Sequence, residues 1–312
     1  MKLLPIMVFA ALSMPAVGLH ADRCLGSGVE VQVLGSGGPE LTPGRASTSY
    51  LIRRDGRASV LIDAGGGSAL RFGDAGARFA DLDLVLFTHL HADHSADFAA
   101  LVKSSYFQDR KRVLPVLGPA AGGVFPATTA WLSALFGKPG GAYAYLSDYL
   151  PGGDGSYVLQ ARDIAIGGDS VEAVYQADGL QVSATTLVHG PVPALGWRID
   201  IGKVSVAFSG DTDGDNGQLE RLAADVSLLV AHNAVPEGAT GAARALHMPP
   251  SVIGRIAGAA AVKSLLLSHR MSRALGREAE TASEIRKAYD GPLDFADDLD
   301  CIPLIPTLSA AP

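Results

Sequence analysis

The sequence predicts an α/β fold in which two β-sheets pack face to face with helices outside them. Both halves of the chain show strand patterns first and helix patterns afterwards, an order that favours this layering. The 312 residues are 48% hydrophobic, which supports a buried core. The 37 glycines and the aromatic content of only 6% suit an α/β protein with many tight junctions between strands and loops.

The first part of the chain shows three strand patterns and one helix pattern. A hairpin is predicted around Asp55-Gly56, because this dipeptide between two apolar runs is a strong turn signal. A buried apolar run then leads into a polar loop, and helical periodicity follows. The strand patterns cover residues 29–38, 48–67 and, with its loop, 81–97; the helix pattern covers residues 95–107.

The rest of the chain begins with a short strand pattern at residues 114–119. More strand patterns follow, and then two helix–strand pairs and a final amphipathic helix. Pro250 lies near the start of a predicted helix, where proline is tolerated. The strands cover residues 161–167, 180–189, 196–202 and 203–212, the pairs residues 219–234 and 248–270, and the last helix residues 278–289.

Residues 119–157 differ in composition from the rest of the chain. They are rich in Gly, Pro and aromatic residues and contain one helix pattern and three neighbouring tyrosines, Tyr143, Tyr145 and Tyr149. One interpretation is a surface excursion that packs on its own aromatic side chains. The other is a lid that borders the active site, and we favour a position near the site.

The N-terminus has the form of a secretory signal peptide over residues 1–21. Lys2 precedes a short apolar stretch, and small residues follow toward a cut after Ala21; a cut after Gly18 fits nearly as well. An uncleaved anchor is the alternative, although the stretch is short for a membrane span. We expect a periplasmic or secreted protein in which residues 22–312 form a single domain.

The chain has two cysteines, Cys24 and Cys301, near its opposite ends. In an exported protein they suggest one disulfide that ties the termini together. Closing so long a loop is worth about 4 kcal/mol or more in the chain-entropy model. Two free thiols are the alternative, which an oxidising compartment disfavours.

The charge of the chain gives no indication of a polyanionic partner. The formal net charge is −7, and phosphate contacts need clustered Lys and Arg. The cluster Lys103, Arg110, Lys111 and Arg112 is interpreted as a solvated helix end, although it could steer a small anion. We therefore expect a small-molecule substrate, no nucleic acid and no stable membrane insertion after signal removal. The oligomeric state stays open, with a homodimer possible.

The stretch LFTHLHADHSAD, residues 86–97, places four potential metal ligands in six positions after an apolar strand. His89 and His91 are two residues apart, so both imidazoles can point into one cavity. Asp93 and His94 reach a second point beyond them. Imidazole and carboxylate together suit zinc or a neighbouring transition metal. Because such groups rarely gather without a metal, we prefer a metal site to a solvated polar loop.

Three further candidates each follow an apolar strand pattern. His189 ends VSATTLVH, Asp211 ends VSVAFSGD and His269 ends VKSLLLSH. Buried strand ends that converge on one edge are where α/β folds place their chemistry. We therefore add all three to the set, whereas Asp97 is interpreted only as a polar residue at a helix start.

With these residues in place, the chain resembles hydrolases of the metallo-β-lactamase fold, from VLGSGG to LLLSHR. The order H-x-H-x-D-H, then His, then Gly-Asp-Thr, then His is highly specific. Within that superfamily the chain is most similar to the branch of ribonuclease Z, arylsulfatase and phosphodiesterase, through the segments VLGSGG, LIDAGGG, GPVPALGWRI, FSGDT and VKSLLLSHR. The resemblance implies a four-layer αββα sandwich of two mixed β-sheets with helices on the outer faces.

The resemblance also implies two zinc ions held by separate groups of ligands and joined by one carboxylate. The first zinc would take His89, His91 and His189, the second Asp93, His94 and His269, and Asp211 would bridge both. A water between the metals becomes a nucleophile near neutral pH. Asp93 would also orient that water and take its proton, so it is a candidate catalytic residue.

Residues around the ligands are expected to support them. Asp63 is similar to the family's buried acidic residue, which would orient a ligand. Thr88 and Thr212 could act in the same way, and simple loop capping is the alternative for both.

The chain departs from ribonuclease Z proteins at two motifs. It has His232-Asn233-Ala234 where they usually carry His-Glu-Ala, and His247-Met248-Pro249 where they usually carry His-Ser-Thr. His247 therefore stays a candidate catalytic residue that gives a proton to a leaving group or binds an oxyanion, but without its usual glutamate partner. His232 is interpreted as structural.

The predicted function is an exported dinuclear zinc hydrolase that cleaves a phosphodiester or a related ester such as an aryl sulfate. The alternative is a lactone or β-lactam hydrolase on the same metals; a bridging Asp211 is compatible with lactonases but not with typical β-lactamases. A third possibility is an inactive metal-binding scaffold, against which the complete ligand set argues.

Overall fold

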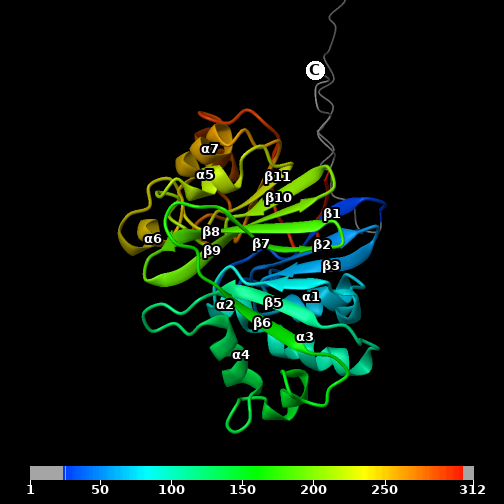
Figure 1. Cartoon of the computed structure of the whole chain (residues 1–312). Helices are drawn as coiled ribbons and strands as arrows, with labels where there is room; N and C mark the ends of the chain where they lie inside the picture. Colours follow the sequence, from blue (N-terminus) through cyan, green and yellow to red (C-terminus); the bar gives the residue numbers. More distant parts are fainter. Residues whose placement is uncertain (1–23, 25, 305–312) are drawn as a thin grey trace, which may run out of the picture.

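The computed structural model describes residue 24 and residues 26–304; the predicted signal peptide, residues 1–21, lies outside them. The described residues form two seven-stranded sheets that pack face to face, with helices on both outer sides (Figure 1). This arrangement confirms the predicted α/β sandwich of two mixed sheets. None of the described helices is long and apolar enough to cross a membrane.

The first sheet has the strand order β14-β1-β2-β3-β4-β5-β6. Its strands are β1 (Val29–Gly35), β2 (Ser49–Arg54), β3 (Arg57–Ile62), β4 (Leu84–Leu86), β5 (Leu114–Pro119), β6 (Leu159–Ile164) and β14 (Cys301–Pro303). Pairing is antiparallel from β14 to β3 and parallel from β3 to β6. The predicted hairpin joins β2 to β3, and both Asp55 and Gly56 have positive φ, as such a two-residue turn requires.

The second sheet has the order β13-β12-β11-β10-β9-β8-β7. Its strands are β7 (Glu172–Ala177), β8 (Leu180–His189), β9 (Val192–Ile201), β10 (Val204–Phe208), β11 (Leu228–His232), β12 (Leu265–Ser268) and β13 (Leu293–Phe295). Pairing is antiparallel from β7 to β10 and parallel from β10 to β13. The C-terminal ends of β10, β11 and β12 therefore meet at one edge of the sheet.

The helices cover the outer faces of the two sheets. They are α1 (Ser68–Asp74), α2 (Ala92–Ser95), α3 (Phe98–Ser104), α4 (Thr128–Phe136), α5 (Gln218–Leu222), α6 (Gly241–Leu246), α7 (Pro250–Ala259) and α8 (Glu278–Ile285). Helices α1, α3 and α4 pack on the first sheet, and α5, α7 and α8 pack on the second (Figure 1). Three-residue η1 (Phe79–Asp81) and η2 (Ser105–Phe107) and the longer η3 (Ala144–Tyr149) are 3₁₀-helices on the first side.

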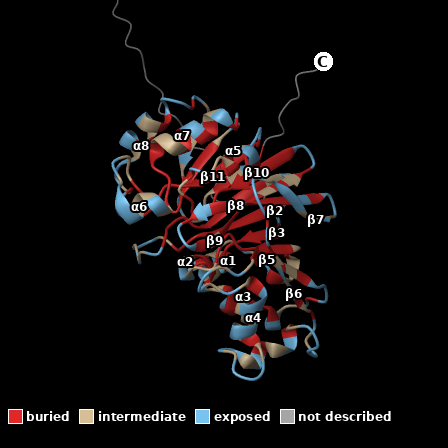
Figure 2. Ribbon diagram, turned by 60° about the vertical axis from the view of Figure 1, so that its left-hand side comes forward, coloured by how far each residue is buried: buried red, intermediate tan, exposed pale blue. Residues whose placement is uncertain are grey.

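The strands of the first sheet contribute side chains to two apolar layers, one between the sheets and one beneath the outer helices. Val60 and Ile62 of β3 point into the core between the sheets, where Val206 of β10 also lies. Leu61, between them, points to the outer core and joins Phe98 of α3. Successive side chains of a strand face opposite sides, so a strand covered on both faces is apolar throughout. Buried residues fill most of the strands, whereas exposed residues lie on the edge strand β7 and on helices and loops (Figure 2).

The segment 119–157 packs mainly on the first sheet. Leu132, Phe136 and Tyr149 belong to the outer core of that sheet, and the rings of Tyr149 and Tyr157 stack at 4.6 Å. Most of the segment is thus a surface excursion packed on its own aromatic side chains. Only its first residues, the turn between β5 and α4, reach the edge where the predicted ligands lie.

The basic cluster after α3 is not a solvated helix end throughout, which corrects the interpretation at Arg110. Its side chain is buried, and its guanidinium donates hydrogen bonds to the carbonyl oxygens of Leu82 (2.7 Å) and Val113 (3.0 Å). Lys103, in contrast, lies over the exposed ring of Tyr106 at 4.5 Å. The sequence pattern misled here because a charge run does not reveal which member turns inward to pair with carbonyl groups.

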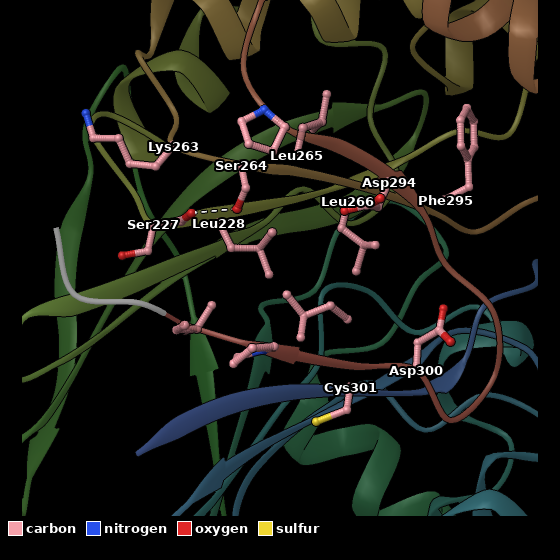
Figure 3. A pocket seen from close by; sticks show the side chains of 14 residues that line it. Ser227, Leu228, Lys263, Ser264, Leu265, Leu266, Asp294, Phe295, Asp300 and Cys301 are labelled. Carbon is pink, nitrogen blue, oxygen red and sulfur yellow. Dashed lines mark hydrogen bonds between the residues drawn. The ribbon is translucent and has the colours of Figure 1, made fainter. Parts of the chain in front are cut away.

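The two cysteines form the predicted disulfide, with the Cα atoms of Cys24 and Cys301 5.3 Å apart. Cys301 opens β14, the edge strand beside β1. A largely apolar pocket of about 290 Å³ lies beside it, between β14 and the N-terminal ends of β11 and β12, and Leu228 and Leu266 point into it (Figure 3). The predicted metal ligands follow the opposite, C-terminal strand ends, so this pocket is separate from them.

Candidate metal centre

The loop after β4 begins the centre and brings the first group of histidines together. His89 is buried directly beyond the strand, and His91 lies at the N-cap of the short helix α2. His189, the last residue of β8, faces both, with ring centroids 4.9 Å from His89 and 5.2 Å from His91. One ligand atom of each of these three residues lies within 4.8 Å of the others.

A second group of ligands lies next to the first. The Nε2 atom of His269 is 3.3 Å from Asp93 Oδ2, and the Nε2 atom of His94 is 3.6 Å from the same oxygen. His94 comes from α2 and His269 follows the end of β12, with a positive φ of 53°. The parallel strands of the two sheets therefore deliver groups from distant parts of the chain to one place.

Asp211 lies between the two groups. Its Oδ2 atom is 3.6 Å from His189 Nε2 and 3.8 Å from His94 Nε2, and its Oδ1 atom is 3.3 Å from His269 Nε2. Asp211 follows β10 after Gly210, whose φ of 52° turns the chain sharply beside Thr88. The structure thus brings all seven predicted ligands together, with one carboxylate in contact with both groups.

Two buried ring nitrogens show that the cluster fits metal ions. His189 donates a hydrogen bond from Nδ1 to the carbonyl oxygen of Leu246 at 2.9 Å, and His94 Nδ1 pairs with Asp63 at 2.7 Å. The Nε2 atoms of both histidines are buried and have no hydrogen-bond partner among the described residues. A buried polar atom without a partner is costly, and imidazole whose other nitrogen is already hydrogen-bonded is a good metal ligand.

Asp63 orients the His94 ring through the contact with its Nδ1 atom. It follows β3, is fully buried, and accepts hydrogen bonds from the backbone N–H and the hydroxyl of Thr88, both at 2.7 Å. Thr88 therefore supports the centre through Asp63. Thr212 instead accepts a hydrogen bond from Gly214 N–H at 3.2 Å, which is a loop cap.

His232 contacts the centre more directly than the sequence indicates. Its Nδ1 is 2.8 Å from Asp211 Oδ1, and its Nε2 is 3.2 Å from the hydroxyl of the buried Tyr50. This chain of contacts fixes the orientation of the Asp211 carboxylate. His232 ends the apolar strand β11, so the rule that selected His189 and His269 could also have selected it.

The ligands of the metal-free cluster differ in their protonation. Burial lowers the pKa of His89 well below its usual value, so its ring is neutral. Burial opposes ionisation of Asp93, but the hydrogen bond with His269 and the nearby His94 outweigh it and lower the pKa to about 2. For His94, burial is outweighed by Asp63 and Asp211, which raise the pKa to about 9. A metal must therefore displace a proton at His94.

His247 lies at the border of the cluster. Its ring centroid is 5.5 Å from that of His189 and 5.7 Å from that of His269, and its Nδ1 is 3.8 Å from Asp211 Oδ1. The Nδ1 atom of His247 is buried without a hydrogen-bond partner among the described residues, and so are both side-chain amide atoms of Asn233.

Asp97, at the N-cap of α3, accepts a hydrogen bond from Ala69 N–H at 2.9 Å and stays outside the centre.

Comparisons with known proteins agree with the fold and with this cluster. The family model of the β-lactamase superfamily domain matches residues 58–270. Ribonuclease Z of Mycobacterium sp. (strain KMS) is 28% identical over 297 residues, which cover 91% of this chain and 99% of the relative. Ribonuclease Z of Mycobacterium bovis (strain BCG / Pasteur 1173P2) is 31% identical over 206 residues, covering 65% of this chain and 69% of the relative.

Among solved structures, the short form of human tRNase Z superposes with a TM-score of 0.68 at 17% identity, covering 88% of this chain and 99% of that chain. Fold, family match and ligand cluster together define a metal-dependent hydrolase of the metallo-β-lactamase fold. The chain belongs to the β-lactamase superfamily and, within it, to the branch that contains ribonuclease Z.

These relatives correct the prediction about partners. A small-molecule substrate without nucleic acid was expected from the net charge of −7, because phosphate contacts need clustered Lys and Arg. That prediction is wrong, because the curated relatives are ribonucleases Z, enzymes named for their action on RNA. Net charge averages over the whole surface, whereas a phosphodiester is held locally, so the overall charge was no ground for excluding RNA.

Proposed function

We propose that the chain is a two-zinc phosphodiesterase that cleaves phosphodiester bonds of RNA or short oligonucleotides. The observation that carries this proposal is the position of the Asp211 carboxylate, within 3.3–3.8 Å of histidines from both groups. A carboxylate in that place can serve two cations at once, and two-metal centres suit the displacement reaction at phosphorus. The ribonuclease Z relatives support RNA as the substrate class.

The ligands divide between two zinc ions in this proposal. His89, His91 and His189 would hold one, Asp93, His94 and His269 would hold the other, and Asp211 would serve both. When bound, the cations supply Lewis-acid chemistry, which activates a water for attack and stabilises charge on the phosphoryl oxygens. The Asp93 carboxylate, whose Oδ2 atom is 3.3 Å from His269 Nε2 and 3.6 Å from His94 Nε2, would orient that water and take up its proton.

We assign to His247 the binding of a phosphoryl oxygen. Burial lowers the pKa of His247 to about 4, so the ring is neutral at pH 7 and is a poor proton donor. A neutral imidazole still donates one N–H hydrogen bond. His247 lies beside Asp211, so that hydrogen bond can be directed at charge that develops on the substrate.

The test uses zinc-loaded protein with bis-p-nitrophenyl phosphate and a single-stranded RNA oligonucleotide. Asp211→Asn should lower turnover of both by more than about 100-fold, since losing a group that merely supports a ligand already costs on the order of 10–100-fold. Asp83→Asn is the matched control, because Asp83 is a carboxylate held by Ser59 and Arg57 away from the cluster. Turnover of a homoserine lactone or nitrocefin, with neither phosphodiester cleaved, would overturn the proposal.

We also propose that the protein is exported. The composition of residues 1–21 supports this proposal, and the disulfide between Cys24 and Cys301 suits an oxidising compartment. Cell fractionation with an antibody against the mature chain tests it. Recovery of the full-length, uncleaved chain from the cytoplasm would contradict it.

A further inference from the structure

The turn between β5 and α4 presents an aromatic ring to the first group of ligands. The ring centroid of Phe125 lies 5.7 Å from that of His91, with 61° between the ring planes. Phe125 is half-buried, and Val124 before it is 93% exposed. The neighbouring aromatic residues Phe136 and Tyr149 belong to the outer core, whereas Phe125 does not. Its ring is thus placed at the centre and not in the core.

The turn is held firmly in this position. Gly122 and Phe125 exchange backbone hydrogen bonds, N–H to carbonyl, at 3.2 and 2.9 Å. Gly123 between them has a φ of 57°, which favours glycine. Gly122 packs so closely on Pro193 of β9 that an added Cβ would come within 2.7 Å of its Cγ. The fold therefore sets the backbone of this turn, which carries the Phe125 ring next to His91.

We propose that Phe125 is a specificity-determining residue on which a base of the substrate stacks, the base next to the scissile phosphodiester. This inference rests on the proposed function, which places the phosphate on the metals that His91 and its neighbours hold. The base of a nucleotide is one ribose away from its phosphate, and Phe125 is the aromatic residue in ring contact with His91. Stacking on an aromatic side chain accepts any base, because every base has a π-face.

Base stacking also accounts for how an acidic chain can recognise RNA. The metal centre holds the phosphate, and an aromatic platform adds affinity without a basic surface. This predicts little preference among the four bases, but a clear preference for a substrate that carries the stacked base over an analogue that lacks it. It also predicts that the effect depends on the presence of an aromatic ring at position 125, so Phe125→Tyr should keep it.

The test compares a uridylyl-uridine dinucleotide with its analogues that lack the base on one side or the other. For the zinc-loaded wild type we expect kcat/KM to fall about ten-fold when the stacked base is missing, the size typical of one base–aromatic contact. Phe125→Ala should abolish this difference, and Phe125→Tyr should restore it. Phe107→Ala is the matched control, because Phe107 is 79% exposed and lies in η2, after the C-terminal end of α3.

Binding gives a second readout that does not depend on turnover. Calorimetry should show uridine 5′-monophosphate binding the wild type about ten-fold tighter than ribose 5-phosphate, and Phe125→Ala should bind both equally. If wild type and Phe125→Ala show the same base preference in both assays, the role of Phe125 is overturned while the phosphodiesterase stands. If the wild type cleaves no dinucleotide with zinc bound, the proposed function fails, and the inference falls with it.

Discussion

Replacing Asp63 by asparagine should weaken the second metal position more than any comparable change outside the ligand set. The Asp63 carboxylate accepts one hydrogen bond from Thr88 N–H and others from the Thr88 hydroxyl and His94 Nδ1, all at 2.7 Å. An amide has the same shape but offers only one acceptor oxygen. The NH₂ group of asparagine would donate a hydrogen bond to His94 Nδ1. This favours the tautomer of His94 that carries its proton on Nε2, and Nε2 is the atom that must bind the metal.

The magnitude follows from these contacts. Loss of an outer partner of a metal-bound histidine typically costs on the order of 10–100-fold in metal affinity. The lost hydrogen bond to a charged group, buried on all sides, should lower the free energy of unfolding of the metal-free protein by about 2–3 kcal/mol. Chelator competition measures the zinc affinities one by one, mass spectrometry gives the metal content, and urea unfolding of the chelated protein gives the stability.

Asp83→Asn provides the control for this experiment. Asp83 precedes β4 at the opposite end from Thr88 and accepts hydrogen bonds from Ser59 and Arg57, both at 2.7 Å. Its partner Arg57 is exposed, so the loss should stay within about 1 kcal/mol and leave the zinc affinities unchanged. If Asp63→Asn retains two zinc ions at wild-type affinity, the assignment of Asp63 as the support of a metal ligand is refuted.

Three further predictions concern protonation, the disulfide and the phosphoryl-binding histidine. In the metal-free protein burial is outweighed by the nearby Asp63 and Asp211, which raise the pKa of His94 from 6.5 to about 9, so its stabilisation is complete below pH 6.5 and lost as the pH rises through about 9; urea unfolding should show this loss for the wild type, and an equal loss in His94→Gln would contradict it. Cys301→Ser removes a crosslink with a sequence separation of 277 and should lower the free energy of unfolding by about 5–6 kcal/mol in the chain-entropy model, whereas unchanged urea midpoints under oxidising conditions would speak against it. His247→Ala should lower kcat about 10–1000-fold with two zinc ions still bound; loss of zinc instead would make His247 a metal ligand.

Much of the candidate site follows from the sequence because strand ends are local signals. His189, Asp211 and His269 each end an apolar run. Strands β8 and β10 run in the same direction because both are antiparallel to β9, and β10, β11 and β12 are parallel, so these C-terminal ends lie on one edge. The same holds for the hairpin at Asp55-Gly56, whose turn chemistry is complete within two residues. Where a pattern depends on near neighbours in the chain, the sequence determines the element before any tertiary contact is known.

Other features depend on contacts between residues far apart in the chain. The short edge strands β13 and β14 have three residues each, too few for an alternating pattern, and they form only against their neighbours. Arg110 looks like its charged neighbours in the sequence, and only the fold places it beneath the carbonyl groups of another loop.

The sequence by itself therefore determined the class of fold, the residues after strand ends that the fold gathers into the candidate metal centre, and the partners of the disulfide. Only the tertiary structure decided that His232 and Tyr50 hold Asp211, that Asp97 stays outside the centre, and that Phe125 faces His91. The physical reason is that a ligand needs only the right donor atom at the right strand end, whereas a supporting or stacking residue is defined by what it touches. Those contacts join segments that no local pattern connects.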